Sequence, residues 1–393
     1  MRKLDFEKTM ADFTGRMDIE DCPKALQPYC GVYGFCSFES VQLMEDVVYE
    51  PSKLEALDTP ILQYDLFRFV LVFDHFRDIL HVMELVPEGE ESRIHEIQDL
   101  LRHTMSSGYS FEVKGEVVSN LSDEQFLEMI EKGKTHVKRG DVFQVVLSRK
   151  FKQSYVGDEF QVYRKLRTIN PSPYLFYFDL GNTVIMGSSP EAHLVVNERQ
   201  AEIHPIAGTY PRSGNDQQDA QDALKLARDP KEQAEHTMLV DLARNDLNRH
   251  CENVKVDTLQ EVQFFSHVIH LVSKVTGEIH PEGNVPALFG GTFPAGTLSG
   301  APKHMALNII KNLEPDLRGP YGGAIGMFGF FGHCQHAIII RSFVAKNHQL
   351  ISQAGAGVVL DSEPQKELEE VHHKLSALSK TIQNIQDYEG IGS

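Results

Sequence analysis

The sequence R-G-P-Y-G-G-A-I-G-M-F-G-F at residues 318–330 is followed by A-I-I-I-R-S-F at residues 337–343 and by I-S-Q-A-G-A-G-V-V at residues 351–359. The middle segment is apolar, as strands often are, and ends on one arginine, Arg341. The flanking glycines have no side chain, so a ligand can approach the backbone N–H groups there. A buried guanidinium needs a partner, and its planar fork suits a carboxylate or phosphate. Two interpretations stay open: a ligand site, or a core strand whose Arg341 forms a structural ion pair.

The composition narrows the class of protein. The chain has 393 residues, is 41% hydrophobic and 24% charged, and carries a net charge of −18. Such a composition is ordinary for a globular protein, and the negative charge argues against nucleic acid or an anionic membrane as partner. The five cysteines form no C-x-x-C pair, which fits a reducing compartment. The polar N-terminus and the lack of a membrane-length apolar run lead us to expect a cytoplasmic protein with no membrane partner.

The first half of the chain contains strand and helix patterns. Residues 30–40 and 67–75 alternate or run apolar, as strands do. Ser122, followed three residues later by Gln125, predicts a capped helix that runs to about residue 139.

Gln144 is the odd member of a strand predicted at residues 142–149, V-F-Q-V-V-L-S-R. A neutral amide inside an apolar strand must find hydrogen-bond partners or a ligand. The spacing alone leaves both interpretations open, a satisfied core glutamine and a site residue.

Three short strands are predicted between residues 174 and 206. G-S-S-P-E at residues 187–191 and A-G-T at residues 207–209 end such runs with small residues. Loops held at strand ends are where site residues tend to lie. We see no linker that divides the chain, so we expect one intertwined α+β domain.

Two helices are predicted to carry paired glutamates. Asp229 as N-cap, Pro230 at the first position and Glu232 at the third indicate a helix start. Glu232 and Glu235 are three residues apart and share a face. Glu232 also fits a capping box, whereas Glu235 has no capping role.

The last helix is predicted to begin at residues 362–365, directly after a glycine-rich turn that follows Ala354. Glu367, Glu370 and Lys374 lie on one stripe, beside a predicted core stripe formed by Leu368, Val371, Leu375, Leu378, Ile382 and Ile385. The two E-x-x-E faces offer the oxygen ligands that Mg²⁺ prefers. Two solvated helix faces would show the same spacing, so that alternative stays open.

Ten motifs, in order between about residues 140 and 374, carry a family resemblance: F-Q-V-V-L-S-R, N-P-S-P-Y-L-F-Y, G-S-S-P-E, P-I-A-G-T, K-E-Q-A-E-H-T-M-L-V-D-L-A-R-N-D-L, H-L-V-S, G-T-L-S-G-A-P-K, R-G-P-Y-G-G-A-I-G, I-I-I-R-S and Q-A-G-A-G-V-V-L-D-S. On these motifs the chain resembles the chorismate-utilising enzyme family, and within it the large subunits of anthranilate synthases.

The resemblance implies an α+β fold of two facing antiparallel β-sheets flanked by helices, with the site between the sheets. It implies one chorismate-binding domain over residues 1–393, in which residues 1–115 are a shortened N-terminal part and residues 116–386 the catalytic core. The implied activity is a lyase reaction of tryptophan biosynthesis, the conversion of chorismate and ammonia to anthranilate and pyruvate.

The resemblance also assigns a metal. Glu235 and Glu370 would hold Mg²⁺, and Glu232 and Glu367 would act directly or through water. The metal would in turn hold the ring carboxylate of chorismate, a dianion that this acidic protein would otherwise repel.

Substrate-binding roles follow for residues in the opening segments and next to them. Arg341 and Tyr321 would receive the enolpyruvyl carboxylate, with backbone at Gly357. Gly355 and Ala207 would line the same pocket.

Catalytic roles follow in the same way. Glu191 would protonate the departing C4 hydroxyl, because hydroxide is a poor leaving group. His270 matches the histidine associated with pyruvate elimination, and Thr209 and Lys374 would line the site.

Two positions distinguish members of the family. Relatives that add water carry a lysine base where this chain has Gln144. Aminodeoxychorismate synthases commonly carry a nucleophilic lysine where this chain has Ala207. Both positions favour the ammonia-using, anthranilate-forming members.

The chain departs from the family pattern in two ways. It shows no L-L-E-S motif for tryptophan feedback, and only N-P-S-P-Y at residues 170–174 remains of that inhibitor site. It shows no G-x-C-x-G glutaminase motif, since Cys334 lies in G-H-C-Q-H. We therefore expect a separate glutamine amidotransferase subunit to supply the ammonia.

Two alternatives remain from the sequence. The first is the aminodeoxychorismate subunit of folate synthesis, since some such enzymes lack the lysine. The second is a non-catalytic chorismate-binding relative, against which the intact Glu191, Glu235, His270, Arg341 and Glu370 weigh.

Overall fold

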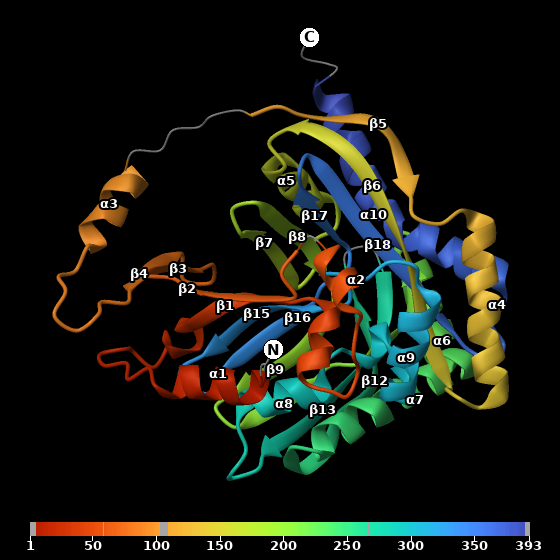
Figure 1. Ribbon diagram of the computed structural model, residues 1–393, viewed down its shortest axis with the longest axis horizontal. Coiled ribbons are helices and arrows are strands. Elements are labelled where there is room, and N and C mark those ends of the chain that lie inside the picture. Colours follow the sequence, from red (N-terminus) through yellow and green to blue (C-terminus); the bar gives the residue numbers. More distant parts are fainter. Residues whose placement is uncertain (1–4, 58, 103–108, 266–267, 390–393) are drawn as a thin grey trace.

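The computed structural model describes residues 5–57, 59–102, 109–265 and 268–389, and only the backbone of Thr209 and of residues 386–389. Two large antiparallel sheets with helices outside them make up the molecule (Figure 1). The predicted fold class is confirmed. The division into a part at 1–115 and a core at 116–386 stays a prediction.

The first sheet has nine strands, drawn from both ends of the chain. They are β1 (Gly31–Cys36), β2 (Leu62–Leu66), β9 (Ala192–Asn197), β10 (Gln200–Ile203), β11 (Ile206–Pro211), β12 (Cys251–Phe264), β13 (Val268–Ile279), β15 (Ala324–Gly329) and β16 (Cys334–Ile338). The order is β11-β13-β10-β9-β16-β15-β1-β2, with β12 beside β13. The pairing of β1 with β15 joins the N-terminal part to the segment that opened the sequence analysis.

The second sheet has seven strands. They are β5 (Phe111–Ser119), β6 (Gln144–Gly157), β7 (Tyr174–Asp179), β8 (Thr183–Ser189), β14 (Gly300–Ala301), β17 (Ser342–Lys346) and β18 (Gln349–Val358). The order is β14-β6-β18-β17-β8-β7, with β5 beside β6. A separate hairpin is formed by β3 (Phe69–Asp74) and β4 (Ile79–Glu84).

The helices lie outside the sheets. They are α1 (Phe6–Gly15), α2 (Pro51–Glu55), α3 (Ile94–Arg102), α4 (Asp123–Arg139), α5 (Phe160–Ile169), α6 (Asp216–Arg228), α7 (Pro230–Asn248), α8 (Val285–Thr292), α9 (Lys303–Leu313) and α10 (Pro364–Glu389), and 3-10 turns lie at Gln27–Tyr29, Phe38–Leu43 and Gly296–Leu298. Helix α4 packs on β6 and β18, α10 packs on β18 and β5, and α7 packs on β11, β12 and β13. The capping box of Ser122 and Gln125 is formed as predicted.

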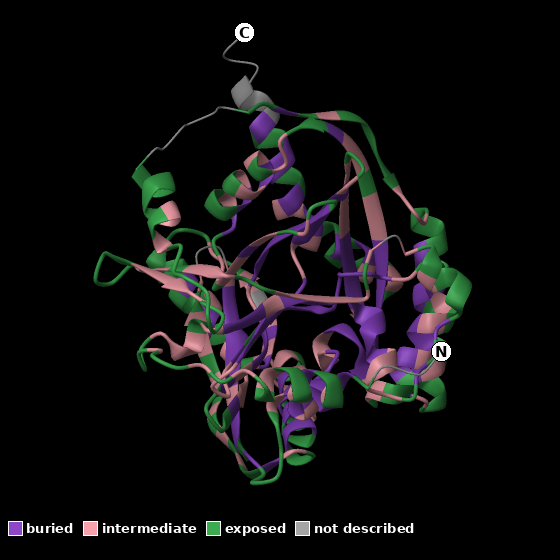
Figure 2. Cartoon of the chain, turned by 60° about the vertical axis from the view of Figure 1, so that its left-hand side comes forward, coloured by how far each residue is buried: buried purple, intermediate pink, exposed green. Residues whose placement is uncertain are grey.

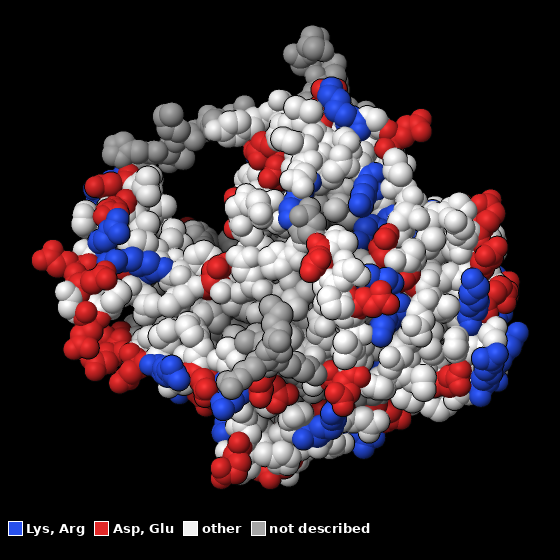
Figure 3. Space-filling view, in the orientation of Figure 1, with Lys and Arg blue, Asp and Glu red and all other residues white. Residues whose placement is uncertain are grey.

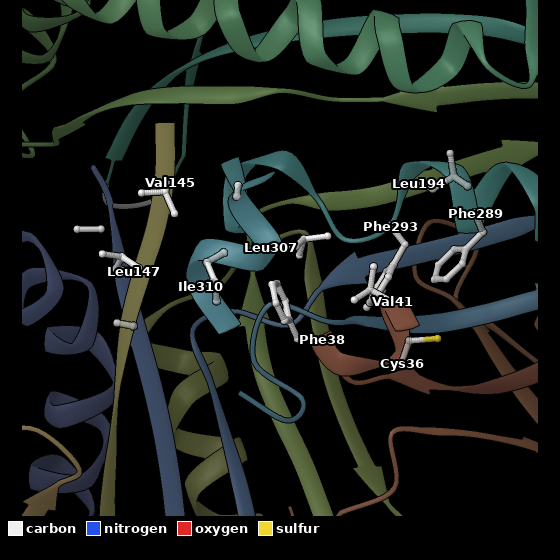
Figure 4. Close-up of a cluster of buried hydrophobic side chains, with 14 of the residues drawn as sticks. Cys36, Phe38, Val41, Val145, Leu147, Leu194, Phe289, Phe293, Leu307 and Ile310 are labelled. Atoms are coloured by element: carbon white, nitrogen blue, oxygen red, sulfur yellow. The ribbon is translucent and has the colours of Figure 1, made fainter. Parts of the chain in front are cut away.

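The core connects both sheets to the inner helix faces (Figures 2 and 4). Figure 4 shows Val145 and Leu147 of β6 on one side of the cluster, Leu307 and Ile310 of α9 in its middle, and Phe289 near Leu194 at the other end. Burying one such side chain contributes about 1.5–3 kcal/mol. The predicted stripe on α10 is buried, which is what holds that helix against the sheet.

Four local predictions are wrong. Residues 337–343 are not one strand, because β16 ends at Ile338 and β17 begins at Ser342. Residues 354–357 lie inside β18 rather than in a turn, and residues 207–209 lie inside β11. The stretch 174–206 holds a fourth strand, β10. In each case pairing with a distant strand decides the backbone, and a single sequence does not show such pairing.

Candidate active site

Arg341 lies where the chain passes from one large sheet to the other. It stands between β16 of the nine-stranded sheet and β17 of the seven-stranded sheet, with a φ of 50°. Left-handed backbone costs an ordinary residue about 1–2 kcal/mol, and such strain is typical of functional sites. Its carbonyl accepts a hydrogen bond from the Ser188 N–H at 3.2 Å. The crossing therefore fixes Arg341 next to the end of β8.

Glu191 follows β8 and lies near this crossing. The Ile338 N–H donates to its carbonyl at 3.0 Å, and the Thr297 hydroxyl donates to its Oε1 at 2.9 Å. Burial raises the pKa of Glu191 to about 7, against opposing effects of Thr297, Lys374 and Arg341. A large share of Glu191 is therefore neutral near pH 7, as a general acid must be.

The charge of Arg341 acts on two neighbours. Burial lowers the pKa of Arg341, and the charge of Glu191 raises it again. The pKa of His270 is lowered by burial and also by Arg341. These three side chains, predicted from separate motifs, therefore lie within electrostatic reach of one another.

His270 lies on β13, opposite Thr209 of β11. Its Nδ1 is 2.8 Å from the Gly208 carbonyl oxygen. A carbonyl only accepts, so Nδ1 carries the hydrogen and donates it. The lowered pKa keeps the ring neutral near pH 7. The side chain of Thr209 lies outside the described residues, and its predicted role stays a prediction.

A bulge in β11 brings the backbone close to α7. The register shifts between Ala207 and Thr209, and Gly208 has a φ of 67°. A Cβ at Gly208 would meet Glu232 Oε2 at 3.0 Å and Leu226 Cδ1 at 2.7 Å, and the positive φ also favours glycine here. The alternative capping role of Glu232 is thus not supported, because its carboxylate lies beside Gly208. Ala207 is buried, and its predicted place in the substrate pocket stays a prediction.

The four predicted glutamates of α7 and α10 repel one another. The pKa of Glu235 is raised by burial and then by Glu370. The pKa of Glu367 is raised by burial and by Glu370, and that of Glu232 by burial and by Glu235. Glu232, Glu235 and Glu367 are partly buried, whereas the side chain of Glu370 is 45% exposed. The two faces therefore meet and concentrate negative charge.

The carboxylate face, formed by Glu232, Glu235, Glu367 and Glu370, does not form a complete metal site by itself. Within the described ranges, no group of three His, Cys, Asp or Glu side chains is placed to hold a metal ion. Its donor chemistry nevertheless fits Mg²⁺, because Mg²⁺ prefers oxygen ligands and is usually bound by one or two carboxylates, with water and substrate completing its shell. A divalent cation would also relieve the repulsion that raises these pKa values.

Lys374 joins the carboxylate face to Glu191. Its Nζ lies 2.5 Å from Glu370 Oε1 and donates to the Gly355 carbonyl at 2.9 Å. Its charge also lowers the pKa values of Glu191 and Glu235. The predicted role of Lys374 in lining the site stays a prediction.

Gln144 lies at the start of β6, facing Gly357 of β18. A Cβ at Gly357 would stand 2.6 Å from Gln144 Nε2, so the glycine makes room for this amide. Gln144 is 5% exposed.

Tyr321 is buried near the same strand. Burial raises its pKa, and the charge of Glu370 adds to this effect. A hydrogen bond from the Gly355 N–H to the phenol oxygen lowers the pKa of Tyr321 and opposes this effect. Tyr321 therefore lies between β18 and the carboxylate face.

Two residues of this region were not assigned from the sequence. Thr297 donates a hydrogen bond to Glu191. It lies in the motif G-T-L-S-G, which could have indicated a site residue. Arg318 precedes Tyr321 and is fully paired inside the protein. Glu191 and Thr297 also line a narrow cavity of about 40 Å³ on the side of β9 and α7. None of the described helices is long and apolar enough to cross a membrane.

Comparisons with known proteins show the family and the fold. A family model described as "chorismate binding enzyme" matches residues 4–380. The anthranilate synthase component 1 of Bacillus subtilis is 39% identical over 385 residues, which cover 91% of this chain and 74% of that protein. Its counterpart in Synechocystis is 47% identical over 277 residues, 67% of this chain and 54% of that protein. The second match therefore spans about half the length of the relative.

A solved structure has the same fold. The crystal structure of anthranilate synthase component I from Streptococcus pneumoniae superposes with a TM-score of 0.84 at 32% identity, covering 95% of this chain and 85% of that one. A menaquinone-specific isochorismate synthase of Escherichia coli reaches a TM-score of 0.74 at 18% identity, which shows the fold alone.

Proposed function

This chain belongs to the family of chorismate binding enzymes, and from that premise we propose that it converts chorismate and ammonia to anthranilate, pyruvate and water. The observation that carries the proposal is the largely neutral carboxyl of Glu191, set near the guanidinium of Arg341 and the ammonium of Lys374. The two cations suit a dianionic substrate, and the neutral carboxyl can protonate a hydroxyl leaving group. The relatives named anthranilate synthase component 1 support the choice of product.

In the first step ammonia adds to C2 of the ring, next to the carbon that carries the ring carboxylate, and the ring double bonds shift as the C4 hydroxyl leaves as water with a proton from Glu191. The added nitrogen then loses one proton to solvent. The Thr297 hydroxyl donates to Oε1, so Oε2 is left to carry the acidic proton. The carboxylate that forms is stabilised by Thr297, Arg341 and Lys374, which all lower its pKa.

Two neutral residues select ammonia as nucleophile. Gln144 has no basic group that could activate a water molecule, and Ala207 has no amine for a covalent bond to the ring. The amide of Gln144, lying on Gly357, offers hydrogen bonds to an incoming ammonia without taking its proton.

The second step removes pyruvate and makes the ring aromatic. A ring proton is lost, the C–O bond to the enolpyruvyl group breaks, and the released enolate takes up a proton to become pyruvate. Neutral His270 has a basic Nε2, because its Nδ1 donates to Gly208. His270 is therefore suited to accept the ring proton.

The carboxylates of chorismate would be held from two sides. Arg341, Tyr321 and the backbone of Gly355 and Gly357 would receive the enolpyruvyl carboxylate. Mg²⁺ on Glu235 and Glu370, with Glu232 and Glu367 acting directly or through water, would hold the ring carboxylate. Bound there, the metal would supply charge neutralisation and polarisation of that carboxylate.

The nitrogen source completes the proposal. The glutaminase motif is missing from the sequence, and of its five cysteines Cys36, Cys251 and Cys334 are buried. A glutamine amidotransferase subunit would therefore supply ammonia in tryptophan biosynthesis, in the cytoplasm.

The test is the identity of the product. The purified chain is incubated with chorismate and an ammonium salt, with and without Mg²⁺, and the product is identified by fluorescence and mass. We expect anthranilate, and only when Mg²⁺ is present. Isochorismate, aminodeoxychorismate as final product, or no turnover would contradict the proposal.

A further inference from the structure

A second pocket lies apart from the candidate active site. It has a volume of about 370 Å³ and is formed by α2 and the residues after it, by β6, by residues 315–317 and by the β17–β18 hairpin. Pockets that bind small molecules measure about 300–1,000 Å³. None of the residues assigned to chorismate or Mg²⁺ lines it.

The pocket is basic in an acidic protein. Four lysines line it, Lys53, Lys150, Lys152 and Lys346, whereas Asp316 is the one acid among its described lining residues. The chain as a whole carries a net charge of −18. Figure 3 shows Lys and Arg side chains gathered over β6 and around α2. Such a concentration of one sign attracts an anion.

Two buried groups make the pocket more than a surface patch. Lys150 is largely buried, and its Nζ donates to the Leu317 carbonyl at 2.9 Å. The Thr59 Oγ1 is buried and has no hydrogen-bond partner among the described residues. A buried polar atom without a partner costs about 1–3 kcal/mol. Thr59 and Lys150 both line the pocket.

The residue types indicate the class of anion. No arginine lines the described part of the pocket, so the planar fork that best matches a carboxylate is missing. Lysines act as point charges and are common phosphate ligands. Gln349 and Thr59 add neutral groups suited to hydroxyls, and the volume exceeds that of one phosphate. We propose that this lysine pocket binds a phosphate monoester of a small polar molecule and thereby weakens chorismate binding.

The route to the active site runs through Lys150. Lys150 binds the carbonyl of Leu317, and Arg318 is the next residue. The guanidinium of Arg318 donates to the Leu298 carbonyl at 2.7 Å and lies 5.9 Å from the ring centre of Tyr321. A phosphate that draws Lys150 away from Leu317 loosens the segment that positions Tyr321. This part of the inference rests on the proposed function, because it assumes that Tyr321 binds chorismate.

The binding test needs no chorismate. Ribose 5-phosphate is titrated into the protein at constant ionic strength, and binding is measured by calorimetry. Ribose alone and inorganic phosphate alone are titrated in the same way, to measure how much the sugar and the phosphate each contribute to binding. We expect ribose 5-phosphate to bind more tightly than either probe. We expect Lys152→Ala and Lys53→Ala, both at exposed positions, to weaken it at least tenfold. Lys132→Ala, an exposed lysine of α4 outside the pocket, should leave it unchanged. Equal binding in wild type and Lys152→Ala, or no binding, would overturn the site.

The coupling test separates this pocket from competition at the active site. Ribose 5-phosphate should raise the KM for chorismate at least twofold in wild type and in Lys132→Ala, but not in Lys152→Ala. A KM rise that persists in Lys152→Ala would mean competition at the active site and would overturn the coupling. An unchanged KM in wild type despite measured binding would also overturn it. Failure of the proposed function would show separately, as lack of anthranilate without any phosphate.

Discussion

Two buried arginines, Arg318 and Arg341, have opposite surroundings. Arg318 forms two hydrogen bonds to Glu314, at 2.9 and 2.6 Å, and further ones to the Leu298 and Val146 carbonyls. Burial alone would lower its pKa, yet Glu314 raises it above the usual value. The pKa of Arg341 is lowered by burial, and Glu191 alone among the described charges counteracts this.

The difference separates structural charges from functional ones. A buried ion is tolerated when hydrogen bonds and an opposite charge replace its water. Arg318 has that replacement inside the protein and therefore connects β6, α9 and the turn at Leu298. Among the described charges, Arg341 has only the carboxyl of Glu191 as an opposite charge, and that carboxyl is largely neutral near pH 7. A substrate carboxylate would supply the missing negative charge.

The largest effect is expected from removing Arg318. Arg318→Ala leaves Glu314 buried without its partner, and breaking such a pair costs about 3–5 kcal/mol. The midpoint of urea unfolding measures this loss. Arg341→Ala is the matched control, with a much smaller loss of stability. Equal destabilisation by the two variants would remove the distinction between the two arginines.

Glu191→Gln tests the acid that faces Arg341. A glutamine keeps the shape and the contact with Thr297 but has no acidic proton. Removing a general acid typically costs 10²- to 10⁴-fold in rate. We expect kcat to fall within that range while the unfolding midpoint stays close to that of wild type. A kcat near the wild-type value would show that the hydroxyl leaves without this acid.

Arg341→Lys tests whether the geometry or only the charge of the side chain is needed at position 341, where the chain passes between the two sheets. Lysine keeps the charge but loses the two parallel hydrogen bonds, and a hydrogen bond to a charged group contributes about 1.5–3 kcal/mol. We expect kcat/KM to fall roughly 10- to 150-fold, by the usual conversion of 1.4 kcal/mol to tenfold. An unchanged kcat/KM would mean that Arg341 serves only a structural pair.

Thr297→Val gives the smallest effect and the most specific one. The pKa of Glu191 is about 7, so its acid form is lost as the pH rises through 7, and activity at constant NH₃ should fall on that side. The Thr297 hydrogen bond favours the ionised form and lowers the pKa. Without it the descending limb should move to higher pH, by about one to two units. Thr297→Ser keeps a hydroxyl and should restore the wild-type profile; a limb that does not move in Thr297→Val would contradict the assignment.

Local features of this fold follow from the sequence, whereas contacts between distant segments do not. Ser122 and Gln125 form their capping box, and the stripe from Leu368 to Ile385 is buried, because both depend on neighbouring residues of one helix. The break before Arg341 cannot be predicted from the sequence, because four apolar residues show no sign of a passage between sheets. The sequence does not fix the position of the Glu232 side chain either, since it depends on Gly208 of another element.

The site could be assigned only through its motifs. Spacing alone left Gln144 and the glutamate pairs undecided between structural and functional roles. The pKa of Glu235 is raised by burial and by Glu370, which lies on α10, a helix more than a hundred residues away from α7. The lysine pocket cannot be recognised in the sequence, because its four lysines come from three separate segments, α2, β6 and β17.

The most direct test of the account is the choice of nitrogen source by the isolated chain. Chorismate and Mg²⁺ are supplied with either an ammonium salt or glutamine, without any partner subunit, and anthranilate is followed by its fluorescence. Because only NH₃ is nucleophilic, the rate with ammonium should rise with pH until Glu191 loses its proton. The account predicts anthranilate from ammonium and none from glutamine. Robust synthesis from glutamine alone, or none from either source, would contradict it.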